Sequence, residues 1–247
     1  MAIVKTEAFV LNKKDLRETS ILATFLTRNF GKIKGELKGI RTTPKKFGSS
    51  LEIGSLNEIV FYQKRSLIHL IDQCDLKESF DFIKTNHKIM SLAFYLIELI
   101  DLIMPLEERN EAVFDLLNKS LIALSTKDAL NSLHIFQIKL LKLSGFKPHI
   151  DSCLSCNNDI GQNCALFSLR LGGLLCQNCS TRDKNANPIL GGTIASLKHI
   201  EKSDWPGSLR LKLMPAIHNE LNKLLFSFFD FHLEKHPRSI KFLKYAE

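Results

Sequence analysis

Two pairs of cysteines place the tightest constraint on how this chain of 247 residues folds. Cys153 and Cys156 are separated by two residues, as are Cys176 and Cys179, and 19 residues lie between the pairs. A spacing of two residues lets a tight turn aim both sulfur atoms at one ion, and a second such turn completes a tetrahedron. The pattern therefore predicts a structural Zn2+ site with these four ligands.

Two nearby residues are alternative ligands: Cys164, between the pairs, and His149, just before the first pair. Catalytic zinc keeps one position open for water, whereas four thiolates close the coordination shell. No His-Glu-x-x-His motif is present, and no His-x-Glu segment precedes the cysteine pairs. We therefore expect the metal to fold a lobe that is too small to build its own core.

The formal charge of +8 is concentrated at the two ends of the chain. Residues 1–80 carry a net +5, residues 81–180 carry −1 and residues 181–247 carry +4. This distribution favours a polyanionic partner that is met mainly through the ends. A Lys-rich surface that is merely solvated is the alternative explanation.

The longest apolar run, 89–104, is interrupted by Glu98 and Asp101, so it indicates a buried helix and no membrane partner. Residues 1–10 lack the apolar stretch of a secretory signal. We therefore expect a cytosolic location, where thiols stay reduced and paired cysteines indicate metal before disulfides.

The first 80 residues have the pattern of short β-strands. Segments rich in β-branched and aromatic residues, separated by polar or Gly-containing turns, lie at 3–11, 20–28, 32–39, 57–65 and 66–76. Five strands in so short a span predict a closed or nearly closed barrel, which leaves no exposed edge. The polar connection 40–55 is expected to protrude.

From about Asp81 the apolar residues repeat with a helical period. The pattern predicts helices over 87–104, 110–125, 128–145, 192–202 and 215–235. The expected fold is therefore α+β and multidomain: a five-stranded β-barrel at 1–80, a helical domain at 81–149 and 186–247, and a four-cysteine zinc lobe inserted at 150–185.

A basic segment lies at the third predicted strand and beyond. Residues 32–46 carry one acidic side chain, Glu36, and six basic ones: Lys32, Lys34, Lys38, Arg41, Lys45 and Lys46. In a strand over 32–38, the lysines and Glu36 share one face while Ile33, Gly35 and Leu37 turn inward. Such a face, continued by a basic loop, predicts a groove that tracks phosphates, with these six residues as the candidate nucleic-acid-binding set and a merely solvated surface as the alternative.

Phe30, Phe47 and Phe61 lie near this segment in sequence and are candidate platforms for base stacking, with burial in the barrel as the stronger alternative. The sequence contains no Walker-type phosphate loop, no Gly-x-Gly-x-x-Gly after a strand and no Gly-x-Ser-x-Gly elbow. We therefore predict that the protein has no catalytic residues and is not an enzyme.

Three segments resemble the bacterial recombination mediator family RecO, in its zinc-containing branch. They are "EAFVLNKKDLRETSILATFLTRNFGKIKGELKGIRTTPKKFGSSLEIGS", "FQIKLLKLSGFKPHIDSCLSC" and "FSLRLGGLLCQNC". A further segment, "PRSIKFL", is similar to a basic, Ser-containing segment near the carboxyl end of family members. Together they cover most of the chain in the family's order.

The resemblance implies an oligonucleotide-binding (OB) barrel followed by a helical domain with an inserted zinc lobe. It also implies a role in DNA repair and recombination by the RecF pathway. That role comprises binding single- and double-stranded DNA, annealing complementary strands and helping RecA load onto DNA coated with single-strand-binding protein (SSB). The implied partners are DNA, RecR, the C-terminal tail of SSB and, indirectly, RecA, at a cytoplasmic, nucleoid-associated location.

Residue by residue, Lys32, Lys38 and Arg41 match basic positions of the family's barrel motif, and the four cysteines match its metal ligands. One stretch departs: Leu133-His134-Ile135 stands where some relatives have a basic residue for the SSB tail. Whether the SSB tail contacts this stretch is therefore an open question, although SSB is still expected to be a partner.

We expect four basic residues near the carboxyl end to assist the barrel: Lys235, Arg238, Lys241 and Lys244. Two other classes of function compete with this interpretation. One is a zinc-ribbon module that binds RNA or takes part in transcription, and the other is a zinc hydrolase or nuclease.

Overall fold

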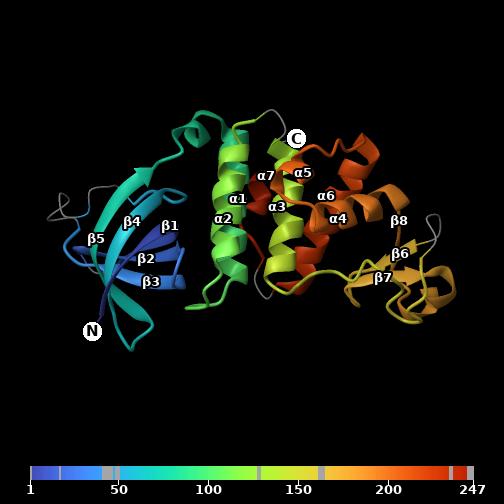
Figure 1. Cartoon of the computed structure of the whole chain (residues 1–247), viewed down its shortest axis with the longest axis horizontal. Helices are drawn as coiled ribbons and strands as arrows, with labels where there is room; N and C mark the ends of the chain where they lie inside the picture. Colours follow the sequence, from blue (N-terminus) through green and yellow to red (C-terminus); the bar gives the residue numbers. More distant parts are fainter. Residues whose placement is uncertain are drawn as a thin grey trace. The chain divides into compact units, whose positions relative to one another are not determined.

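The computed structural model describes residues 2–16, 18–40, 47, 51–126, 129–160, 165–233 and 236–243 (Figure 1). The chain divides into two compact units. The barrel unit comprises Met1–Lys127 with Pro237–Glu247, and the helical unit comprises Asp128–His236. The finer domain limits expected from the sequence remain a prediction.

Five strands of the barrel unit close into a barrel in the order β1-β2-β3-β5-β4. They are β1 (Ala2–Leu16), β2 (Ser20–Thr27), β3 (Gly31–Leu37), β4 (Leu56–Gln63) and β5 (Ile68–Glu78). β4 pairs back to β1, and all neighbours are antiparallel except β3 and β5. A five-stranded barrel of this kind is the OB fold, so the predicted fold class is confirmed.

Side chains alternate between the core and the surface of the barrel, as strand geometry requires. On β3, Ile33 and Leu37 are fully buried in the core. Gly35 also faces inward, because a Cβ atom there would lie 2.5 Å from the Ile71 side chain. The prediction that these three positions turn inward is therefore confirmed.

Two helices follow the barrel in the same unit, after a short 3-10 turn, η2 (Asp81–Thr85). They are α1 (His87–Ile103) and α2 (Glu111–Ala123). The Asn86 side chain accepts from the backbone N–H groups at the start of α1, and Asn110 does the same for α2. These caps satisfy donors that a helix terminus leaves open, which explains where both helices begin.

The connection between α1 and α2 packs against β3. The Glu107 backbone N–H donates to the Lys32 carbonyl (2.8 Å), beyond the stretch of β3 that β5 covers. Gly31 makes this approach possible: its φ is +67°, and a Cβ atom there would lie 2.1 Å from the Glu108 carbonyl oxygen. The connection therefore continues the hydrogen bonding at the amino end of β3.

A short helix, α7 (Ile240–Leu243), contacts α1 within the barrel unit. The Glu98 carboxylate on α1 accepts from the backbone N–H groups of Arg238 and Ser239 (2.8 Å each) and from the Ser239 hydroxyl (2.5 Å). Charge-assisted bonds of this kind are stronger than neutral ones. Glu98 therefore attaches the end of the chain to the unit that holds the barrel.

The helical unit is built around α3 (Ala129–Leu143), which α4 (Gly191–Lys202), α5 (Trp205–Leu209) and α6 (Pro215–His232) contact (Figure 1). Its inserted lobe holds a sheet of order β7-β6-β8 and a 3-10 turn, η3 (Gln177–Arg182). The strands are β6 (Ala165–Ser168), β7 (Gly173–Cys176) and β8 (Asn187–Ile189). No helix within the described ranges is long and apolar enough to cross a membrane.

The first prediction concerns Glu98. Glu98→Ala removes the acceptor for three hydrogen bonds, so we expect the free energy of unfolding of the barrel unit to fall by about 2 kcal/mol. Hydrogen exchange should accelerate at Arg238 and Ser239. The matched control is Glu52→Ala, which removes an exposed ion pair with Lys84 and should cost under about 1 kcal/mol. Unchanged exchange at Ser239 in Glu98→Ala would contradict this role.

The second prediction concerns His134, which is fully buried in α3 with its ring 4.6 Å from that of His218. Burial first, then the charge of His218, lowers the pKa of His134 to about 4. The unfolded chain therefore binds this proton more readily than the folded unit does. The contribution of neutral His134 to the free energy of unfolding is therefore fully present above about pH 6.5. It is lost as the pH falls towards 4.

Between pH 7 and pH 4, we expect the wild type to lose about 3 kcal/mol more stability than His134→Leu. Urea unfolding of both proteins across this range measures the difference. If the free energy of unfolding fell equally with pH in the two proteins, His134 would not be the source of this pH dependence.

Candidate metal centre and nucleic-acid face

The inserted lobe brings together the four cysteines of the two predicted pairs. The sulfur atoms of Cys153, Cys156, Cys176 and Cys179 all lie within 4.8 Å of one another, and those of Cys156 and Cys176 are 3.7 Å apart. Zinc–sulfur bonds of about 2.3 Å place the sulfurs of a tetrahedron about 3.8 Å apart. Four close cysteines with this spacing can hold a metal ion.

Two glycines allow the turns that carry the cysteines to meet. Gly172 has φ +77°, and a Cβ atom on Gly173 would lie 2.3 Å from the His149 carbonyl oxygen. The His149 N–H donates to the Gly172 carbonyl, and the Leu174 N–H donates back to the His149 carbonyl (2.9 Å each). These bonds hold the approach to the first pair against the strand that leads to the second.

The electrostatics of the cluster favour a bound cation. Burial raises the pKa of the Cys153 thiol, but backbone N–H groups directed at the sulfur, that of Cys176 first, together lower it to about 6. A hydrogen bond from Ser155 lowers the pKa of Cys179, but the neighbouring sulfurs, led by Cys176, raise it to about 11. The four thiols cannot all ionise so close together unless a cation offsets their repulsion.

His149, one of the two alternative ligands, is not part of this cluster. Among the described residues, the metal-capable group at this place consists of the four cysteines. The Ser152 hydroxyl donates to Asn157 (2.8 Å), so it accepts from Nε2 of His149 at 2.9 Å. Cys164 lies outside the described residues.

The basic residues predicted on the barrel have different surroundings. Lys34 is half-buried on the outer side of β3, and Lys38 is exposed just beyond its end. Among the described residues, neither lysine forms an ion pair, so both ammonium groups are available to an anion. Arg41, Lys45 and Lys46 lie outside the described residues.

Lys32 is placed differently from Lys34 and Lys38. It is only 8% exposed, and its ammonium group donates to the Asp101 carbonyl (2.5 Å) and lies 3.6 Å from the Asp101 carboxylate. The acidic connection that includes Glu107 covers the same end of β3. In this conformation Lys32 supports the packing of α1 on the barrel, and its contact with DNA remains a prediction.

Several other cations of the barrel unit are held by carboxylates. Arg28 pairs with Glu7 (2.9 Å) and Asp115 (2.8 Å) and stacks on the Phe114 ring, and Lys77 pairs with Glu7 (3.0 Å). The bonds from Lys77 and then Arg28 lower the pKa of Glu7. This network stabilises the β1, β2 and α2 contact and leaves little free positive charge there.

Two of the three phenylalanines considered for stacking belong to the barrel core, and the third packs against it. Phe47 and Phe61 are buried, and Phe30 packs edge-to-face on Phe61 with 5.4 Å between ring centroids. The alternative interpretation, burial, is therefore confirmed for Phe47 and Phe61, whereas Phe30 is half-buried. Leu133, His134 and Ile135 are also buried, inside the helical unit.

Of the basic residues near the carboxyl end, Arg238 and Lys241 are exposed. The Glu98 contacts place them in the same compact unit as the barrel. Lys235 and Lys244 lie outside the described residues. No sequence pattern indicates this attachment, because Glu98 lies about 140 residues away from its partners.

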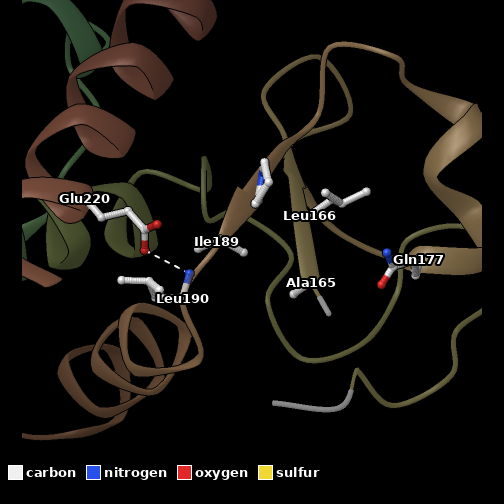
Figure 2. A pocket seen from close by; sticks show the side chains of 7 residues that line it. Ala165, Leu166, Gln177, Ile189, Leu190 and Glu220 are labelled. Carbon is white, nitrogen blue, oxygen red and sulfur yellow. Dashed lines mark hydrogen bonds between the residues drawn. The ribbon is translucent and has the colours of Figure 1, made fainter. Parts of the chain in front are cut away.

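A pocket of about 340 Å³ lies beside β8 in the helical unit (Figure 2). Most of its lining residues are apolar, and among the described residues that line it Glu220 is the ionisable one. The Glu220 carboxylate accepts from the Leu190 N–H at 3.0 Å, the bond drawn as a dashed line in Figure 2. A single carboxylate that is already engaged in this way offers no pair of groups for acid–base chemistry.

Comparison with known proteins gives two matching family descriptions. "Recombination protein O N terminal" matches residues 1–80, and "Recombination protein O C terminal" matches residues 86–241. "DNA repair protein RecO" of Alkaliphilus metalliredigens is 31% identical over 94% of this chain and 95% of its own length. The protein of the same name from Dehalococcoides mccartyi is 30% identical over 97% of this chain and 94% of its own.

These matches cover most of both compact units. The chain belongs to the RecO family of DNA repair and recombination proteins.

Proposed function

We propose that this protein is a non-enzymatic mediator of recombination that binds single- and double-stranded DNA and anneals complementary strands. The observation that carries the proposal is the outer face of β3, where Lys34 and Lys38 are unpaired among the described residues. The basic segment at 41–46 continues from this face along the chain. A cationic groove on an OB barrel suits single strands because it contacts phosphates at any sequence.

Annealing by such a surface needs no catalytic group. The barrier is the repulsion between two phosphate backbones, which bound cations lower while base pairing supplies the favourable free energy. Arg238 and Lys241 belong to the same compact unit and supply further positive charge for a second strand.

The proposal includes RecR and the C-terminal tail of SSB as partners, with RecA loading as the outcome, at a cytoplasmic, nucleoid-associated location. The buried side chains of Leu133, His134 and Ile135 offer no surface for the SSB tail. In this protein the tail therefore contacts other residues. RNA binding by a zinc ribbon is the second candidate, and the same cysteine cluster supports it.

We further propose that the metal is Zn2+ and that its role is structural. Four thiolates match zinc and leave no open position for water or substrate. The lobe has only three short strands and one 3-10 turn among its described residues, so metal binding would contribute much of its folding free energy.

The third prediction tests the barrel face. Lys34→Ala with Lys38→Ala should lower the slope of log K against log salt for single-stranded DNA by about 0.7 per lysine, and should slow annealing of SSB-coated strands. Lys32→Met is the matched control, because its ammonium group is buried against Asp101. It should lower thermal stability and leave the salt slope unchanged.

A double variant with wild-type slope and annealing would refute the barrel face as the DNA site. A decrease of about 0.7 in the salt slope of Lys32→Met, as large as that expected for one lysine of the double variant, would mean that Lys32 turns outward to DNA. Stronger binding to structured RNA than to single-stranded DNA would favour the second candidate.

The fourth prediction tests the metal centre. Purified wild-type protein should contain about one zinc per chain, and Cys176→Ser should lose it together with the solubility of the lobe. Cys74→Ala is the matched control, because Cys74 is buried in the barrel core. It should keep its zinc, as measured by plasma emission spectrometry. A metal-free Cys176→Ser protein with a wild-type melting curve would exclude a structural role.

A further inference from the structure

The register of the barrel assembles an apolar row on its outer face, next to the basic strand. Ile3 on β1 pairs with Tyr62 on β4, Tyr62 pairs with Leu70 on β5, and Leu70 pairs with Glu36 on β3. Directly paired side chains on one face lie about 5 Å apart. Ile3, Tyr62 and Leu70 therefore form one continuous row, here named the Tyr62 row.

The burial pattern shows that this row faces outward. The neighbours of Tyr62 and Leu70 in the chain, Phe61 and Ile71, are each 1% exposed and belong to the barrel core. Tyr62 and Leu70 themselves are half-buried, and Ile3 is 62% exposed. The row therefore presents a partly exposed aromatic ring between one exposed and one half-buried aliphatic side chain, and contiguous apolar groups on a surface can mark a binding site.

Positive charge borders the Tyr62 row on two sides. Lys34 pairs in the ladder with Ile68, which is 37% exposed and lies two residues before Leu70. Lys64 follows Tyr62 by two residues, and among the described residues it forms no ion pair. Glu36 is the acidic neighbour in the row, and Lys5 on β1 is paired with Glu58 (2.6 Å).

We propose that the Tyr62 row is the base-stacking platform for a single DNA strand whose phosphates contact Lys34 and Lys64. The proposal rests on the DNA-binding function proposed above. The proposal assigns base stacking to Tyr62, because Phe47 and Phe61 are buried and Phe30 packs against the core.

The chemistry of the row fits unpaired bases better than a duplex. An exposed aromatic face stacks on any base, whereas a duplex keeps its bases covered and offers only phosphates and groove edges. Adjacent cations hold the backbone while the ring takes up the base. The platform therefore favours single strands, the substrate from which annealing starts.

The test compares two fluorescent probes, an oligothymidine and an abasic strand of the same length, in equilibrium titrations. Tyr62→Ala should weaken oligothymidine binding about 5- to 100-fold and leave abasic binding and the salt slope unchanged. Tyr62→Phe should retain wild-type affinity, since the ring is kept. Lys34→Ala should weaken binding of both probes.

Phe94→Ala is the matched control, because Phe94 is a partly exposed aromatic residue of the same unit, on α1. It should bind both probes as the wild type does, and circular dichroism verifies that each variant is folded. If folded Tyr62→Ala bound oligothymidine as tightly as the wild type, the Tyr62 row would not be a base-stacking platform. A protein partner would then be the better explanation of the row. Failure of the wild type to bind either probe at low salt would instead overturn the proposed function.

Discussion

Closure of the barrel ladder determines what every face of the first unit can do. Because β4 pairs back to β1 and β3 pairs in parallel with β5, each residue of these strands has a fixed side, core or surface. The same register buries Ile33 and Leu37, projects Lys34 to the surface and aligns Tyr62 with Leu70. A slip of one residue in β3 would bury the lysine and expose the core.

The two ends of β3 differ in charge, and this difference restricts where an anionic strand can lie. The connection with Glu107 and the carbonyl of Asp101 occupy the end that holds Lys32. The other end carries Lys34, Glu36 and Lys38, and among the described residues neither lysine forms an ion pair. The cysteine cluster instead lies in the other compact unit, where two turns of an inserted lobe meet.

Local patterns in the sequence were sufficient for much of this structure. The five strands and the five long helices follow from periodicity, and the four cysteines meet as their spacing predicts. Strands of three or four residues, such as β8, are too short to show a period. The burial of Lys32 and the attachment of Ser239 to Glu98 depend on contacts between distant segments, which no local pattern reveals. Tyr62 was missed because its exposure depends on the register of three strands.

The central claim is that the outer face of the barrel holds single-stranded DNA. The most direct measurement is photo-crosslinking of the full chain to a bromodeoxyuridine oligonucleotide, followed by mass spectrometry of the linked peptides. We expect crosslinks in peptides that contain residues 32–46 and 62–70. Crosslinks confined to residues 128–236 would contradict the claim.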